Sequence, residues 1–431
     1  MRSMCALCVL LVLALTVAVP AMARNWTVNA LGTGQAETIQ AAIDAASDDD
    51  TIFLEAGTYM GPGNRDIDFG GKSITVISID GPLVTVIDCE GLGRGFIFQS
   101  GETSSSVLSA VTIANGTHGS YGGGVYCVNS SPVIEDVLFD SNSAGIRGGA
   151  VYCDASNAVI VNNEFEGNSS TYGGALWCSG SSALTVTNNE FISNTATVSG
   201  GAIGCRGSSP SIDGNFFESN TGVFDGGAII CDQTSTADII NNEFRNNDAG
   251  GNGGAVAYFD SPLSIQDNLF WENDAELGGG LYCSDAFAGG NISNNTFDSN
   301  GATNGAAICC TNNSRPPINN NIFSNSTSGE AIYTKNDSWP TITCCCFFNN
   351  AGGDELPPGS TDGGGNFTAD PEFCGIDGSG NYYLQADSPC GPGINHGGTV
   401  CTLIGCMPID CGTTAAEAKT WGEIKQIYTD D

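Results

Sequence analysis

Four carboxylates at repeating positions are the side chains of this sequence best placed to do chemistry. They form two pairs, each 26 residues apart, on either side of Phe165, and they are Asp140, Glu164, Glu166 and Glu190. If phenylalanine faces a core, both pairs face outward, and strand spacings place them in a patch of about 5 by 7 Å. Such a patch raises carboxyl pKa values and can bind a hard cation such as Ca²⁺. A solvated acidic face and acid/base catalysis are the alternatives.

A row of aromatic side chains is the second chemical signal. Tyr126, Tyr152 and Trp177 occupy one position of three successive repeats, and Gly204 interrupts the row in the next. Alternation along a strand directs them away from the core, where stacked exposed rings form a platform that suits sugar rings. We therefore predict carbohydrate binding at these three aromatic residues. The alternative is that the rings only cover one another and the sheet.

Cysteine closes a glycine-rich hexamer such as GGAVYC in most repeats. The positions are Cys127, Cys153, Cys178, Cys205, Cys231, Cys283 and Cys309, with Tyr258 where the interval doubles. Adjacent members would lie about 4.8 Å apart, within disulfide range. The column therefore holds buried thiols as apolar filler, disulfides between repeats, or a metal, although no histidine accompanies it. The cysteines that follow residue 343 favour structural disulfides.

Other catalytic groups are scarce. The bases of the repeats, Arg147, Arg206 and Arg245, belong to different units, and the two histidines, His118 and His396, lie far apart in the sequence. We interpret both histidines as surface side chains. The sequence shows no phosphate-binding loop, nucleophile elbow or HExxH motif.

These side chains are positioned by an internal repeat. Phenylalanine recurs every 26 or 27 residues, at Phe139, Phe165, Phe191, Phe217, Phe244, Phe270, Phe297 and Phe323. Apolar residues alternate within each unit, and Gly, Ser and Asn punctuate it, which is typical of strands and turns. One unit with three short strands cannot bury its own apolar face, but stacked units can. We predict an all-β fold, a single-stranded right-handed parallel β-helix (solenoid) with about 26 residues per coil.

Two further patterns support this fold. Asparagines at equivalent turn positions are expected to form a ladder of amides, and they are Asn163, Asn189, Asn215, Asn242, Asn268 and Asn295. Near the N-terminus, apolar residues at helical spacing follow Thr38, a good N-cap. We expect this helix to cover the open edge of the first coil. Register also predicts that Glu218 stacks over Arg245.

The repeat resembles known families. GGA with an aliphatic residue, paired with FxxN over roughly residues 121–325, is similar to the repeats of polymorphic outer-membrane proteins and other bacterial β-helix proteins. TIQAAIDAASDDDTIFLEAGTY at 38–59 resembles the N-terminal cap of the pectate-lyase superfamily, and NFTADPEF and YYLQADSPCGPG resemble its closing coils. The resemblance implies a β-helix whose sheet often lines a substrate groove. Nothing here resembles the catalytic set of polygalacturonases.

Composition sets the remaining expectations. The formal charge of −35, from 12 basic and 47 acidic residues, excludes a nucleic-acid binder. We divide the chain into a signal peptide (1–23), an N-terminal cap and first coil (24–60), the β-helix (61–411) and a tail (412–431), interpreted as a short docking helix or an attachment tag. We expect a secreted or surface-associated protein, a monomer, without a transmembrane segment in the mature chain.

The sequence thus favours a binding or structural, adhesin-like role over an enzyme. The protein would present one long face to glycans or to neighbouring surfaces, with no certain cofactor beyond the Ca²⁺ considered above. A Ca²⁺-assisted polysaccharide lyase or glycoside hydrolase is the alternative. Fold alone does not decide between them.

Overall fold

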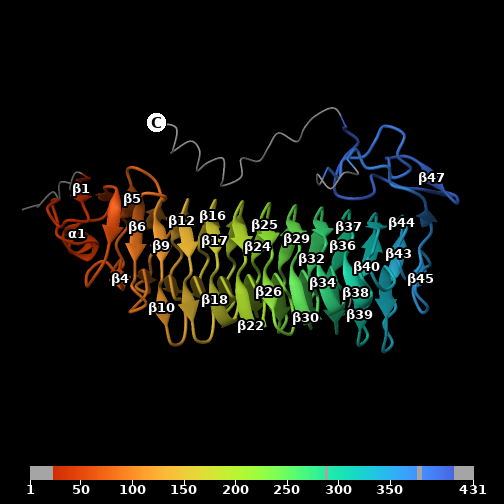
Figure 1. Ribbon diagram of the computed structural model, residues 1–431, viewed down its shortest axis with the longest axis horizontal. Coiled ribbons are helices and arrows are strands. Elements are labelled where there is room, and N and C mark those ends of the chain that lie inside the picture. Colours follow the sequence, from red (N-terminus) through yellow and green to blue (C-terminus); the bar gives the residue numbers. More distant parts are fainter. Residues whose placement is uncertain (1–22, 287–289, 376–380, 412–431) are drawn as a thin grey trace, which may run out of the picture.

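The computed structural model describes residues 23–286, 290–375 and 381–411. The predicted signal peptide and tail fall almost entirely outside these residues. The chain forms a parallel β-helix in which sheets of 14, 13, 11 and 8 strands run along the stack (Figure 1). We name them sheets A, B, C and D in that order. A typical coil contributes one strand to each sheet, in the order C, A, B and D. The sequence predicted three strands per coil and missed the fourth, which forms the short sheet D.

Each sheet gathers the equivalent strands of successive coils, and all pairings within these four sheets are parallel. Sheet A comprises β1 (Asn25–Val28), β2 (Thr51–Leu54), β5 (Thr75–Ser78), β8 (Val107–Ser109), β12 (Val133–Glu135), β16 (Val159–Val161), β20 (Thr185–Thr187), β24 (Ser211–Asp213), β28 (Asp238–Ile240), β32 (Ser264–Gln266), β36 (Asn291–Ser293), β40 (Pro317–Asn319), β43 (Thr341–Thr343) and β45 (Thr361–Asp362). Sheet B comprises β3 (Gly57–Tyr59), β6 (Thr85–Asp88), β9 (Thr112–Ala114), β13 (Leu138–Asp140), β17 (Glu164–Glu166), β21 (Glu190–Ile192), β25 (Phe216–Glu218), β29 (Glu243–Arg245), β33 (Leu269–Trp271), β37 (Thr296–Asp298), β41 (Ile322–Ser324), β44 (Cys346–Phe348) and β46 (Phe367–Thr368).

The glycine-rich hexamers form sheet C, and the strands before them form sheet D. Sheet C comprises β4 (Ile67–Asp68), β7 (Phe96–Phe98), β11 (Val125–Val128), β15 (Val151–Asp154), β19 (Leu176–Ser179), β23 (Ile203–Arg206), β27 (Ile229–Asp232), β31 (Val256–Phe259), β35 (Leu281–Ser284), β39 (Ile308–Thr311) and β42 (Ile332–Thr334). Sheet D comprises β10 (Thr117–His118), β14 (Ser143–Ala144), β18 (Ser169–Tyr172), β22 (Thr195–Ser199), β26 (Thr221–Gly222), β30 (Asp248–Asn252), β34 (Asp274–Leu277) and β38 (Gly301–Asn304).

The repeated phenylalanines stack in the core inside sheet B. From Phe139 to Phe347, consecutive ring centroids lie 4.6 to 5.3 Å apart. Residues 26 positions apart lie on adjacent strands, so each ring packs on a like ring above and below it and the stack is continuous. The stack confirms both the register and the inward direction of phenylalanine.

Asparagine forms two buried ladders, one at each end of the sheet B strands. In the predicted one, the Asn189 amide Nδ2 donates to Asn215 Oδ1 at 3.0 Å and to Ile160 O at 2.9 Å. A second ladder runs through the FxxN positions, where Asn194 Nδ2 donates to Asn220 Oδ1 at 3.0 Å. The residue before a ladder asparagine is left-handed, as at Asn188 with φ 54°. In each Asn-Asn pair, the first asparagine therefore adopts the left-handed conformation, and the second hydrogen-bonds to the backbone with its side-chain amide.

The cysteine column lies inside sheet C, as predicted, and packs as buried thiols together with Tyr258. One assignment is wrong. Cys283 pairs in register with Cys310, and Cys309 lies on the outer face beside Tyr282, because this coil is one residue longer than the hexamer spacing suggested.

Helix α1 (Ile39–Ala45) is short and caps the N-terminal end. Thr38 is its N-cap, since the Thr38 hydroxyl accepts from the Ala41 backbone N–H at 3.2 Å. Ile39, Ala42 and Ile43 are buried, and the helix packs against β1, β2 and β4. The predicted capping face is therefore confirmed. Among the described residues, no helix has the length and apolar character needed to cross a membrane.

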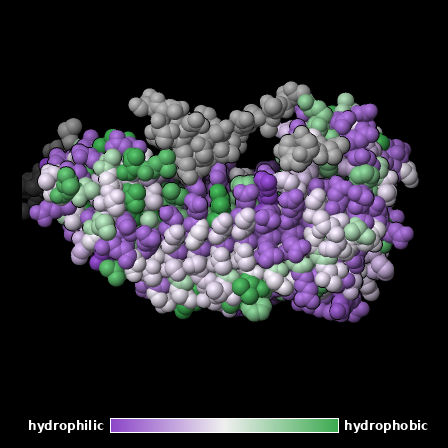
Figure 2. Space-filling model, in the orientation of Figure 1, coloured by the Kyte–Doolittle hydropathy of each residue, from purple (hydrophilic) through white to green (hydrophobic). Residues whose placement is uncertain are grey.

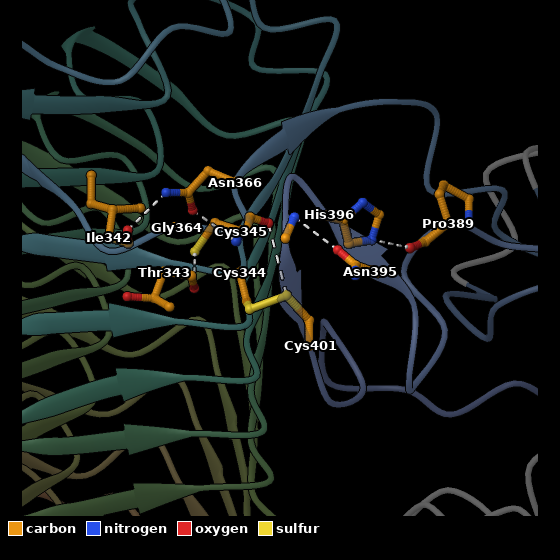
Figure 3. Close-up of a disulfide and its surroundings, with 12 residues drawn as sticks. Ile342, Thr343, Cys344, Cys345, Gly364, Asn366, Pro389, Asn395, His396 and Cys401 are labelled. Carbon is orange, nitrogen blue, oxygen red and sulfur yellow. Dashed lines mark hydrogen bonds between the residues drawn. A yellow bond between two sulfur atoms is a disulfide. The ribbon is translucent and has the colours of Figure 1, made fainter.

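The coils end at β45 and β46, and residues 370–375 and 381–411, which the sequence placed in the β-helix, fold back over the outer face of sheet B (Figure 1). This C-terminal segment contains one antiparallel pair, β47 (Asn395–His396) and β48 (Thr399–Val400). It is held by Cys344–Cys401, with a Cα separation of 5.7 Å (Figure 3), and carries its own Cys374–Cys411 link. The Tyr382 hydroxyl donates to Asp298 at 3.0 Å. The expectation of structural disulfides is thus met by these four cysteines, whereas Cys345, Cys346, Cys390 and Cys406 are free thiols.

Candidate functional site: a groove beside sheet C

The aromatic row on the outer face of sheet C has the predicted register but not the predicted exposure. Tyr126, Tyr152, Trp177 and Gly204 are consecutive partners on β11, β15, β19 and β23. The Tyr126 and Tyr152 rings stack, with centroids 5.7 Å apart and planes 9° apart. However, Tyr152 is only 6 % exposed and Trp177 only 3 %. The predicted open platform of three rings is therefore wrong.

A second row of side chains, at the corner between sheets D and C, covers this aromatic row. Tyr121, Arg147 and Tyr172 follow one another through parallel bridges just before the hexamers. Tyr121 stacks on Tyr152 with centroids 4.6 Å apart, and the Arg147 guanidinium lies 4.6 Å from the centre of the Trp177 ring. Such cation–π contacts fix both partners. The rings are thus held between two layers.

Gly204 allows the Trp177 ring to lean across the next strand. A Cβ atom at Gly204 would lie 2.4 Å from Trp177 Cε3, which no side chain could accept without moving the ring. Beyond this ring the aromatic row stops and Ile230 continues the column. A cavity of about 360 Å³ opens at this point, and we call it the groove. Its walls are Tyr172, Trp177, Val198, Ser199, Asp225, Ile230, Asp232 and Phe259.

The groove combines apolar walls with polar atoms that lack partners. Trp177 Nε1 and Asp232 Oδ1 are buried and have no hydrogen-bond partner among the described residues. The same is true of Nε of Arg147, whose guanidinium packs on the indole ring. Arg206 Nε lies 3.8 Å from Asp232 Oδ1, which is an ion-pair distance beyond hydrogen-bond range. A buried donor or acceptor without a partner costs about 1–3 kcal/mol. Because these atoms have almost no solvent-accessible surface, a ligand in the groove does not reach them in this conformation.

Two carboxylates face the groove from different elements. Asp232 ends β27 on sheet C; burial raises its carboxyl pKa, and the charges of Arg206 and Arg147 oppose this rise. Asp225 follows β26 and accepts from Asn252 Nδ2 at 2.7 Å and from the Ser199 hydroxyl at 3.5 Å. Burial also raises the Asp225 pKa against these bonds. Titratable groups perturbed in a cavity are typical of functional sites.

The predicted acidic patch is in register but does not converge. Glu164 pairs with Glu190, and Asp140 pairs with Glu166, on β13, β17 and β21 of sheet B. Glu164 is buried and Glu166 is exposed. In residues 23–286, 290–375 and 381–411, no three His, Cys, Asp or Glu side chains are arranged to hold a metal ion. Calcium binding at these four residues stays a prediction.

Two other sequence predictions have direct outcomes. Arg245 Nη1 lies 3.5 Å from Glu218 Oε1, which confirms the predicted ion pair on sheet B. Arg147 and Arg206, assigned to separate repeats, both act electrostatically on Asp232. The sequence missed Asp225 and Asp232 as site residues. The interruption of the aromatic row at Gly204 was the available signal.

Comparisons with known proteins agree with the fold. Residues 64–227 and 227–361 match the family model described as "Right handed beta helix region", which confirms the predicted hand. Nothing found supports the closer resemblance to polymorphic outer-membrane proteins. The chain matches none of the curated protein sequences.

Several solved structures share this fold at low identity. The A-module of the Azotobacter vinelandii mannuronan C-5 epimerase AlgE6 is 15 % identical over 77 % of this chain and 94 % of its own, with a TM-score of 0.46. The catalytic unit of a GH87 α-1,3-glucanase from Streptomyces thermodiastaticus is 16 % identical over 82 % and 71 %, with a TM-score of 0.41. Pectate lyase Pel9A is 13 % identical over 90 % and 96 %, with a TM-score of 0.35. These likenesses concern the fold alone.

Proposed function

Because the chain belongs to the right-handed β-helix family, whose fold supports many activities, we propose its function from the groove: it binds carbohydrate there. The protein would be a secreted or surface-associated glycan-binding protein. One observation carries the proposal: the indole of Trp177 and the carboxylates of Asp225 and Asp232 line one cavity.

A sugar offers hydroxyl groups to the two carboxylates that line the groove. Its hydroxyls can donate to accessible carboxylate oxygens of Asp225 and Asp232. A purely apolar ligand would instead remove water from these carboxylates without replacing its hydrogen bonds. The apolar faces of sugar rings can pack on the Ile230 and Phe259 side chains, which line the same space. Mixed surfaces of this kind orient a ligand by a few polar groups among apolar contacts.

Size and charge narrow the ligand further. The volume of about 360 Å³ lies near the lower end of the roughly 300–1,000 Å³ of small-molecule sites, so the groove holds a short segment of a glycan. The chain carries a formal charge of −35, and anionic polymers are repelled by such a field. A neutral glycan therefore fits better than a polyuronate.

Exposed apolar residues, such as Phe224 at 56 %, occur in small patches, and Figure 2 shows small apolar patches on the face in view.

Titration of a panel of neutral and acidic oligosaccharides tests this proposal. We expect Trp177→Ala to weaken binding of the best neutral ligand at least tenfold, which corresponds to about 1.4 kcal/mol. The matched control is Trp339→Ala, which removes an exposed tryptophan packed on Arg315 outside the groove. Equal affinity of wild type and Trp177→Ala, or no binding across the panel, would refute the proposal.

A further inference from the structure

Two buried cysteines of the sheet C column approach each other more closely than unbonded sulfur atoms normally do. Cys283 on β35 and Cys310 on β39 are register partners on adjacent parallel strands, and their Sγ atoms lie 3.0 Å apart. A disulfide bond is about 2.05 Å long, so this separation falls between a covalent bond and an ordinary contact. We infer that Cys283 and Cys310 form a disulfide that links two successive coils in the mature protein.

The backbone permits this bond. In-register residues on neighbouring parallel strands have Cα atoms about 4.8 Å apart, and disulfides span about 4.4–6.8 Å between Cα atoms. Both side chains point into the core, and neither has any exposed surface. The sulfurs must approach by about 1 Å to reach bonding distance, which is an adjustment of the side chains and leaves the strand register unchanged.

The neighbours in the column separate this pair from the other column cysteines. Tyr258 is the register partner of Cys283 on one side, and Thr334 is the register partner of Cys310 on the other. Cys309 precedes Cys310 in the sequence, but it lies on the outer face of the sheet. The two thiols are thus an isolated couple, from which a single disulfide can form.

The other column cysteines differ in number and in their contacts. Five of them precede Tyr258 without a break, so complete pairing within that run would leave one thiol over. Cys178 Sγ, for example, lies 3.3 Å from the Ser208 hydroxyl oxygen. In the Cys283–Cys310 pair, by contrast, sulfur faces sulfur.

The bond forms by exchange with a disulfide-bonded oxidant of the compartment in which the chain folds. The thiolate of one cysteine attacks that disulfide and forms a mixed disulfide, and the second thiolate then displaces the sulfur of the oxidant. Two S–H bonds break and one S–S bond forms in the protein, while the oxidant leaves as two thiols that carry the two electrons and two protons. The chain also holds Cys344–Cys401 and Cys374–Cys411, which are typical of proteins that mature among such oxidants.

Burial determines when this bond can form and how long it lasts. The contact with Cys283, together with burial, raises the pKa of the Cys310 thiol, so the reactive thiolate is scarce in the folded coil. We therefore expect oxidation during folding, before the two coils close on each other. In the folded chain the same burial excludes reductants, whereas Cys411 of the Cys374–Cys411 link is exposed.

Peptide mapping of the full chain, secreted and purified without reductant, tests the link. The protein is unfolded in iodoacetamide, which blocks free thiols, and is then digested. We expect residues 283 and 310 to be unblocked and to join two peptides into one species that is two hydrogen atoms lighter than the separate thiol peptides. Cys345 is the internal control and should be blocked, because its Sγ contacts Thr343 O at 3.4 Å and Ile318 O at 3.6 Å. Blocked Cys283 and Cys310, or a bond from either one to another cysteine, would overturn the inferred link.

Reduction and unfolding provide a second test. A reductant added to the folded protein should open Cys374–Cys411 while Cys283–Cys310 persists until urea unfolds the chain, and simultaneous opening of both would contradict a buried link. Cys283→Ala should lower the urea midpoint more than Cys345→Ala, because it removes a cross-link as well as a buried thiol. This difference should disappear when both variants are unfolded in reductant. Equal midpoints of the two variants without reductant would overturn the link.

Discussion

Replacing Gly204 by alanine tests how the groove is built without touching a polar group. The added Cβ would lie 2.4 Å from Trp177 Cε3 and 2.5 Å from Cζ3. Carbon atoms pack best at about 3.5–4.0 Å, so the indole must move by about 1 Å. Overpacking of this kind costs about 1–3 kcal/mol, and the lower chain entropy of alanine returns about 0.4–1 kcal/mol. We expect a net loss of stability of about 1–2 kcal/mol.

The same displacement moves the Trp177 indole, which lines the groove, and should weaken oligosaccharide binding at least tenfold, that is by about 1.4 kcal/mol. Urea unfolding measures the stability, and calorimetric titration measures the affinity. Gly119→Ala is the matched control, because a Cβ at Gly119 meets no atom within 4 Å and its φ is not left-handed. A Gly204→Ala protein that unfolds and binds like wild type would show that the indole does not lie against this glycine.

Three further predictions concern the coil and its charges. Asn220→Ala should destabilise the protein by about 2–4 kcal/mol in urea unfolding, because the buried Asn194 backbone N–H and side-chain amide both lose Asn220 Oδ1 as their acceptor. A loss below about 1 kcal/mol would contradict a stabilising role of the asparagine ladder. Glu218→Gln should change stability by less than about 1 kcal/mol, since its pair with Arg245 is partly exposed and screened, and a larger effect would show a buried network. Burial raises the Asp225 pKa above 3.8, so this carboxyl favours folding most below that pH and its contribution falls as pH rises through the folded-state value. Asp225→Asn should therefore gain stability relative to wild type as pH rises above about 4, and a parallel pH dependence of the two proteins would contradict the shift.

The coil was predictable because its signals repeat. Phe165 and Phe191 fix one register, and that register alone correctly places Glu218 beside Arg245. The asparagine ladder follows from the same interval. The prediction for Cys309 failed because one coil contains an extra residue, and a strand that slips by one residue exchanges its two faces.

The groove was not predictable, because it arises where the repeat breaks. Its Trp177 wall is held by Arg147 and Tyr172, which precede the hexamers in segments without a shared sequence pattern. The lean of Trp177 over Gly204 is a tertiary contact, and it determines where the cavity opens. The C-terminal segment shows the same limit: Tyr382 contacts Asp298, 84 residues earlier, on the outside of sheet B.

The central claim, that the groove binds carbohydrate, is tested most directly by a crystal structure of the protein with the tightest-binding neutral oligosaccharide of the panel. We predict one sugar ring within the cavity, packed beside Trp177, with hydroxyl groups that donate to the carboxylates of Asp225 and Asp232. A sugar seated elsewhere, for example on the half-buried Tyr126, or an empty groove at saturating ligand, would contradict the account.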